Sequence, residues 1–293
     1  MPRLVRWIWL LLGIHLAIGM VAYAHFLVTG TYAFISLYFL FLGSFYFLVM
    51  TASECILAFM CRSWFDSDEP MQLAWTMIAC AAMARFGGTL LREASNGQLP
   101  WGLGHWLIPH TGGLFSNSGQ LGLLVGGPVS MAFLAIGLAR VLSIQRKFHL
   151  VGSLTRGDQA LLFLILAFSI SQIAINVPLL AHHPSLGTVL LWLSDPLLSL
   201  LLIEAVLVRR SVVRIGQGLL ANCWGMYVVA VAITSLGDAT IWATSHNLLS
   251  EPLTVLSWYI WFVAAAAFAC APAYQLAAMS LTREEILHLP ETR

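Results

Sequence analysis

The sequence predicts an all-α integral membrane protein, a bundle of eight transmembrane helices with both termini in the cytoplasm. Of its 293 residues, 59% are hydrophobic and only 9% are charged, whereas an ordinary soluble domain has about a quarter charged residues. Apolar stretches of membrane-spanning length recur along the chain, and the basic residues gather between alternate stretches. We therefore expect the lipid bilayer to be its environment.

A helix needs about 20 mostly apolar residues to cross a hydrocarbon layer ~30 Å thick, because each residue rises ~1.5 Å. Eight stretches meet this requirement, and they predict a single transmembrane domain over 1–293 with a short cytoplasmic tail at 282–293. The predicted spans are 5–29, 32–60, 71–91, 120–143, 159–181, 187–208, 217–243 and 254–280.

The orientation follows from the basic residues, which accumulate on the cytoplasmic side of bacterial-type membranes. One side of the predicted bundle carries Arg3, Arg6, Arg62, Arg140, Arg146, Lys147, Arg156, Arg209, Arg210, Arg214, Arg283 and Arg293. This distribution predicts a prokaryotic-type plasma (inner) membrane protein with its N- and C-termini inside. Residues 1–24 also fit a cleavable signal peptide ending at Ala24, but the length of the apolar run favours a retained span.

The two halves of the chain share a pattern of residues. Laying 151–281 over 1–150 brings His25 onto His182, Glu54 onto Glu204, Trp75 onto Trp224 and Gly88 onto Gly237, at offsets close to half the chain. Each unit would contain four spans, so the two would have the same orientation and form a parallel tandem repeat. Chance is the alternative, because apolar helices use few residue types.

Ionisable groups inside a bilayer are costly, and each is a functional-site hypothesis. At ~1.5 Å per residue, Arg85 lies roughly 21 Å from the cytoplasmic end of its span. Four polar residues share the outer half with it, and together they predict an outward-facing ligand-binding pocket of Arg85, Gln172, Asn176, Asp195 and Asp238.

In this pocket Arg85 would hold an anionic group while Asp195 and Asp238 exchange a proton, since one guanidinium cannot fully balance two carboxylates. The alternative is a buried arginine–aspartate pair that fixes helix packing. The pair Gly87 and Gly88 would let a neighbouring backbone or a ligand approach the helix of Arg85 closely.

Two other acids lie nearer the cytoplasmic ends of their spans. Glu54 is within about two turns of Arg62, and Glu204 is within two turns of Arg209 and Arg210. We expect these acids to pair with those basic neighbours at the membrane interface.

The sequence favours a protein that recognises a small molecule or lipid-like ligand, as a transporter or sensor module. The alternative is a non-catalytic membrane subunit of a redox or photosynthetic complex, in which His15 would be the cofactor-binding residue beside a quinone or tetrapyrrole. Other membrane or cytoplasmic subunits are expected partners in either case.

Several classes of protein are excluded by what the sequence contains. A retinal protein needs a lysine within a span, and the only lysine is Lys147 in a predicted cytoplasmic loop. The net charge of +1, without a cluster of more than three lysines and arginines, argues against nucleic acid as a partner. No catalytic or metal-ligand motif is present, so an enzyme is the less favoured class and no metal is expected.

Overall fold

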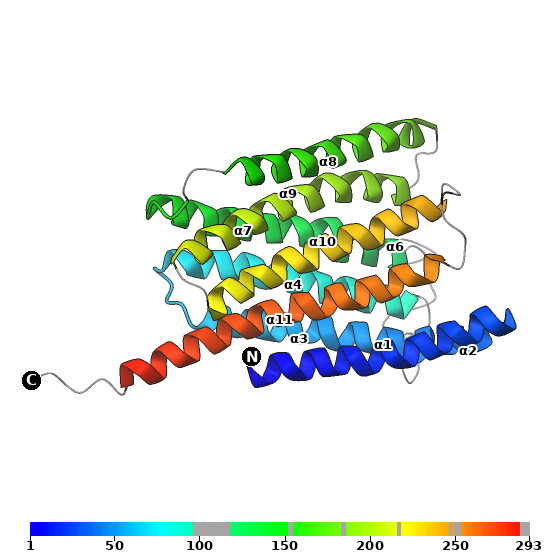
Figure 1. Ribbon diagram of the computed structural model, residues 1–293, viewed down its shortest axis with the longest axis horizontal. Coiled ribbons are helices and arrows are strands. Elements are labelled where there is room, and N and C mark those ends of the chain that lie inside the picture. The colour runs from blue at the N-terminus through cyan, green and yellow to red at the C-terminus, as the bar shows by residue number, and fades with distance from the viewer. Residues whose placement is uncertain are drawn as a thin grey trace, which may run out of the picture.

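The computed structural model describes residues 1–95, 118–151, 155–182, 186–215, 218–245, 248 and 253–287. Within these ranges the chain forms helices joined by turns, which confirms the all-α class predicted from the sequence. The helices run roughly along one common direction (Figure 1). Helix α1 begins and helix α11 ends at the same end of the bundle.

The helices have the following bounds. They are α1 (Arg3–Thr29), α2 (Ala33–Leu37), η1 (Tyr38–Gly43), α3 (Ser44–Ser63), α4 (Pro70–Ser95), α6 (Ser118–Leu124), η4 (Val125–Val129), α7 (Ser130–Lys147), α8 (Arg156–His182), α9 (Leu186–Ile215), α10 (Leu219–Ser245) and α11 (Thr254–Leu287). The π-helical turn η1 joins α2 directly to α3, and η4 joins α6 directly to α7. Residues 33–63 and residues 118–147 therefore each form one long helix. Pro128 lies inside η4, where its missing N–H interrupts the α-helical hydrogen bonds.

Each of the eight predicted spans coincides with one long helix. Among the described residues, six helices are long and apolar enough to cross a membrane: α1, the helix from α2 to α3, α4, the helix from α6 to α7, α10 and α11. Helices α8 and α9 have 27 and 30 residues, which is also sufficient length. The chain is therefore a helical, multi-pass membrane protein with six to eight spans.

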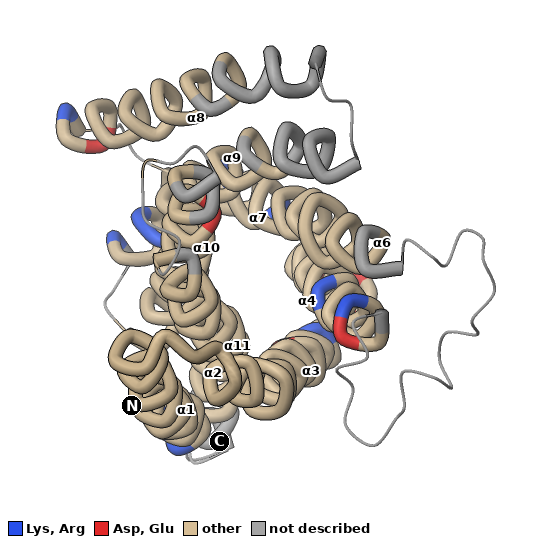
Figure 2. Tube along the Cα trace, turned by 90° about the vertical axis from the view of Figure 1, so that its right-hand side faces the viewer, with Lys and Arg blue, Asp and Glu red and all other residues tan. Residues whose placement is uncertain are grey.

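The long helices form a closed ring. In the described part of the chain, α3 packs on α4, α4 on α7, α7 on α9, α9 on α10, α10 on α11, and α11 again on α3. Figure 2 looks along this ring and shows α1 and α8 outside it. Helix α1 packs against α11, and α8 packs against α9.

Small residues let the helices of the ring approach closely. The centre of α11 carries an alanine-rich run, 264–271, that is buried throughout, and both α10 and α3 pack against this helix. Gly88 of α4 lies directly against the backbone of Gly122 and Gly126. Contacts of this kind allow van der Waals packing to hold the helices together. In a membrane this matters because lipid tails are as apolar as the side chains, so the hydrophobic effect does not drive helices to associate.

Basic residues gather at the end of the bundle where α1 begins. Arg62 lies in the last turn of α3, Arg146 and Lys147 in the last turn of α7, Arg156 at the start of α8, and Arg214 in the last turn of α9. We call this the basic end.

Helix α8 begins with a capping box that also holds it to α9. The Thr155 N–H donates to Asp158 Oδ2 at 2.7 Å, and the Asp158 N–H lies 3.3 Å from Thr155 Oγ1, which satisfies two N–H groups that a helix start leaves open. The Thr155 hydroxyl and Arg210 of α9 contact the same carboxylate. Asp158 therefore both starts α8 and attaches it to the ring.

This attachment should depend on pH. The Thr155 hydroxyl, and beyond it Arg210 and Arg214, hold the pKa of Asp158 below its ordinary value. A lowered folded-state pKa gives stability that is present above the unfolded value of about 3.9 and is lost as the pH falls through the folded value. We expect Asp158→Asn to speed amide hydrogen exchange at the start of α8 at neutral pH, and the difference from wild type to vanish in acid.

Asp66, in the turn after α3, supplies the matched control, because no contact of its side chain is present among the described residues. Asp66→Asn should leave exchange in α8 unchanged at every pH. Equal exchange of wild type and Asp158→Asn at neutral pH would contradict the role assigned to Asp158.

Candidate functional site

The most buried ion pair in the described structure joins α3 and α4. Arg85 NH1 donates to Glu54 Oε1 at 2.5 Å, and the two side chains expose only 13% and 3% of their surface. Side chains on a helix lean toward its N-terminus, and α3 and α4 run in opposite directions. Glu54 therefore leans away from the basic end and Arg85 leans toward it, so that their charged groups meet near the middle of the bundle.

An aromatic ring lies against the guanidinium of Arg85. Arg85 Cζ lies 3.8 Å from the centroid of Phe268, which comes from the buried alanine-rich part of α11. A cation at this distance is attracted by the face of the ring. Arg85 is thus held on one side by a carboxylate and on another by an aromatic face.

Tyr227 of α10 completes this group of residues. It is fully buried, and its helix packs against α11, which carries Phe268. Its ring continues into a line of aromatic side chains, with centroid distances of 6.3 Å to Phe268 and 5.8 Å to Trp224. We call Glu54, Arg85, Tyr227 and Phe268 the central cluster.

The central cluster has hydrogen-bonding capacity that the described residues do not use. Glu54 Oε2 and the Tyr227 hydroxyl are buried without a partner among them. Arg85 carries five N–H donors, of which one is bonded to Glu54. Buried polar groups nearly always have a hydrogen-bond partner in the protein, in water or in a ligand. The unused groups of this cluster could therefore hydrogen-bond to a polar ligand.

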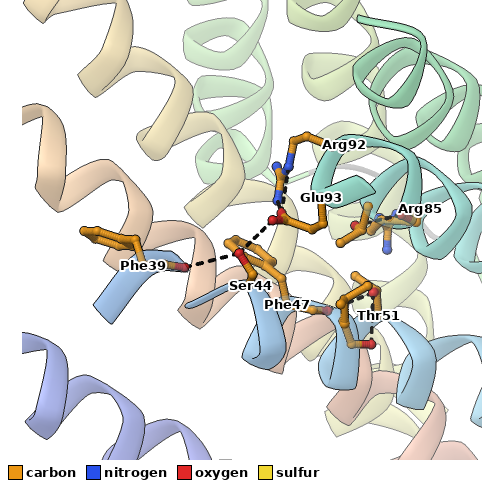
Figure 3. A network of polar contacts seen from close by, with 9 residues as sticks. Phe39, Ser44, Phe47, Thr51, Arg85, Arg92 and Glu93 are labelled. Carbon is orange, nitrogen blue, oxygen red and sulfur yellow. Dashed lines mark hydrogen bonds and ion pairs between the residues drawn. The ribbon is translucent and has the colours of Figure 1, made fainter. Parts of the chain in front are cut away.

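A second polar cluster lies two turns further along α4, away from the basic end. Glu93 is buried and accepts from Arg92 Nε and NH2 at 3.1 and 2.7 Å, while Ser44 Oγ donates to its other oxygen at 2.6 Å (Figure 3). Arg92 also lies 5.3 Å from the ring of Phe47 and 5.5 Å from that of Trp258. Residues seven apart share a helix face, so Arg85 and Arg92 place two guanidinium groups about 10 Å apart along one side of α4.

The pocket predicted from the sequence is only partly described. Arg85 pairs with Glu54 rather than with an aspartate, and Asp238 Oδ1 accepts from Trp261 Nε1 at 3.1 Å. The structure therefore gives Arg85 and Asp238 different partners. The side chains of Gln172, Asn176 and Asp195 lie outside the described residues.

Glu54 and Glu204, the two acids predicted near the cytoplasmic ends of their spans, do not have the predicted partners. Glu54 pairs with Arg85 of the neighbouring helix, whereas Arg62 donates to Thr76 at 3.5 Å. Arg210 pairs with Asp158, and Glu204 Oε2 is buried without a partner in the described part of the chain. The prediction that both acids pair with basic neighbours on their own helices was wrong, because α4 supplies a nearer cation to Glu54 and α8 supplies a carboxylate to Arg210.

His15 of α1 lies in an aromatic cluster. Its Nε2 is 2.8 Å from the Tyr38 hydroxyl, Tyr46 stacks on its ring at a centroid distance of 4.2 Å, and Phe262 meets it edge-on at 4.4 Å. A tetrapyrrole ligated by Nε2 would have to displace Tyr38. The arrangement attaches α1 to η1, α3 and α11.

Sequence reasoning did not identify Glu93 or Tyr227. Glu93 follows Arg92 near the end of α4 and reads as an interfacial pair, although the i, i+7 spacing of Arg85 and Arg92 was a visible signal. Tyr227 has no distinguishing neighbour in the sequence, and only the packing of α10 on α11 brings its ring to Phe268 in the central cluster.

Comparison of the sequence with the models of known protein families found no match, and comparisons with curated proteins and with solved structures found none either.

Proposed function

We propose that the chain binds a small molecule or lipid-like ligand with an anionic group at the central cluster, as the recognition step of a transporter or sensor module. One observation carries this proposal: a buried arginine inside the helix ring uses one of its five donors on Glu54 and keeps 13% of its side-chain surface accessible. A carboxylate or phosphate accepts two parallel hydrogen bonds from such a guanidinium.

A purely structural role is a weaker account of the pair. Buried ion pairs seldom add net stability over apolar packing, because desolvation of both charges offsets their attraction. Inside a bilayer this cost is high, and ionisable residues there usually belong to ligand or ion pathways. The unused oxygen of Glu54 and the unused Tyr227 hydroxyl add an acceptor and a donor at the same place.

The other residues of the predicted pocket would line the approach from the end opposite the basic end. In this proposal Gln172, Asn176, Asp195 and Asp238 lie along the outer half, and the two aspartates exchange a proton as the ligand moves. Arg92 and Glu93 would be the charged pair that the ligand meets before it reaches Arg85.

We further propose that the basic end faces the cytoplasm of a prokaryotic-type cell and that both termini lie there. The accumulation of arginines at this end supports that orientation. In this proposal other membrane or cytoplasmic subunits are the partners that receive its output.

The parallel tandem repeat is also proposed, and the packing order of the helices supports it. In the first half α3 packs on α4 and α4 on α7; in the second half α9 packs on α10 and α10 on α11, while α1 and α8 both lie outside the ring. The equivalent tryptophans Trp75 and Trp224 meet with ring centroids 6.0 Å apart. Gly88 and Gly237 each contact the next helix of their own half.

The test is to identify what the purified protein carries. The full chain, extracted in mild detergent, would be examined by native mass spectrometry, and any bound molecule would be released and identified. We expect an anionic molecule on wild type that is lost from Glu54→Gln/Arg85→Gln, a variant that removes both charges together and so leaves no lone buried ion.

Arg140 of α7 is exposed, so Arg140→Gln is the matched control and should keep the bound molecule. The proposal fails if wild type and the double variant carry the same molecule in the same amount. It also fails if the wild-type absorbance spectrum shows a bound tetrapyrrole, since that result would favour a cofactor-carrying subunit.

A further inference from the structure

Glu204 occupies the place in α9 that Glu54 occupies in α3, but without an arginine beside it. Under the proposed repeat, the position equivalent to Arg85 is Thr234 of α10, whose hydroxyl donates to its own helix at Ala230 O. Glu204 Oε2 is buried and has no partner among the described residues. The second half thus keeps the acid of the pair and replaces the cation.

The contacts of α9 fix which residues surround Glu204. This helix packs against α7, α8, α10, η4 and α6. Ser194 lies beside Gly127, Arg209 beside Gly225, and Arg210 beside Asp158. From each contact we count the same number of residues along both helices until α9 reaches Glu204. This places Glu204 level with Gly137 of α7, Leu164 of α8 and Ala230 of α10.

Among the described residues no cation forms a salt bridge with Glu204, since the three ion pairs there are Arg85–Glu54, Arg92–Glu93 and Arg210–Asp158. Within one turn of it, α7 offers only Arg140, which is exposed, α8 offers no titratable group, and α10 offers Tyr227. The stretch 118–129, covering α6 and η4, contains no titratable residue. On α9 itself, the two nearest arginines lie more than one turn from Glu204. Arg210 forms an ion pair with Asp158, and Arg209 lies against Gly225. The side chain of Asp195 is not among those described.

We propose that Glu204 is a proton-binding site inside the bilayer, where its carboxyl group takes up and releases a single proton. A carboxylate without a counter-ion in an apolar environment is strongly disfavoured relative to the neutral acid. Glu54 differs because Arg85 contacts its carboxylate directly. The two halves of the ring would then contain one ion pair and one acid that changes its charge, independently of which ligand Arg85 binds.

Dicyclohexylcarbodiimide tests this inference, because this apolar reagent enters membranes and modifies carboxyl groups that carry a proton. The full chain in liposomes would be treated over a range of pH, digested and examined by mass spectrometry. We expect an adduct on Glu204 that declines as the pH rises, and none on Glu54. Glu204→Gln should lose the adduct while Glu54→Gln keeps it.

The wild-type result alone decides the matter if a variant does not fold, because the modified residue is located in the peptide map. Lack of an adduct on Glu204 in acid, or equal modification of Glu54 and Glu204, would overturn the inference. Infrared difference spectra give a second measurement: the carboxylic acid band that changes with pH should disappear in Glu204→Gln. Its persistence there would assign the proton to another residue.

Discussion

Arg85→Met is expected to destabilise the helix ring by about 3–5 kcal/mol, the usual cost of leaving one partner of a buried ion pair alone. The substitution keeps a long apolar side chain against Phe268 but removes the cation that Glu54 contacts. Glu54 is 2% exposed, so water cannot replace the lost partner. Unfolding of the purified protein in mixed micelles, followed by circular dichroism, measures the change.

The double variant Glu54→Leu/Arg85→Met isolates the pairing from the packing. Both charges are then absent, so no carboxylate remains buried alone, and most of the lost stability should return. A double-mutant cycle completed with Glu54→Leu gives the coupling free energy. If Arg85→Met unfolds with wild type, or if the double variant is as unstable as Arg85→Met, the pair does not hold α3 and α4 together.

The fold class could be predicted from the sequence because its signal is simple and repeated. Span length and apolar composition follow from the thickness of the bilayer, and eight runs of the right length give eight long helices. The alternation of basic residues predicted which helix ends lie together, as the basic end shows. These properties belong to single helices and need no knowledge of how the helices pack.

The partners of the buried charges could not be predicted in the same way. Depth counted along the backbone put Arg85 in the outer half and Glu54 near the cytoplasmic end, although their side chains lean toward each other and meet. Which helix faces which is also absent from a single sequence. The order of the ring brings α3, rather than α8 or α9, against the charged face of α4.

The sequence predicted a close helix contact at the pair Gly87 and Gly88, and the structure has one. The sequence did not predict which of the two glycines makes the contact. A methyl group on Gly88 would lie 2.3 Å from Gly126 N and 2.5 Å from Gly122 O, whereas one on Gly87 would meet nothing within 4 Å. The two residues point in different directions around α4. Only the position of α6 and η4 determines which of them is in contact.

Gly88→Ala is accordingly expected to cost about 3 kcal/mol, at the upper end for an overpacked contact, because the obstructing atoms belong to the backbone and cannot rotate away. Helix α4 must move from α6 and η4, which also shifts Arg85 and Arg92 on the same helix. Gly87→Ala, one residue away, has open space and should change stability by less than about 1 kcal/mol, toward greater stability, since alanine favours helix. The two variants differ by one position and are identical in chemistry, so unfolding of both in the same micelles separates close packing from helix propensity. Equal stability of the two would show that α4 and η4 do not pack at Gly88.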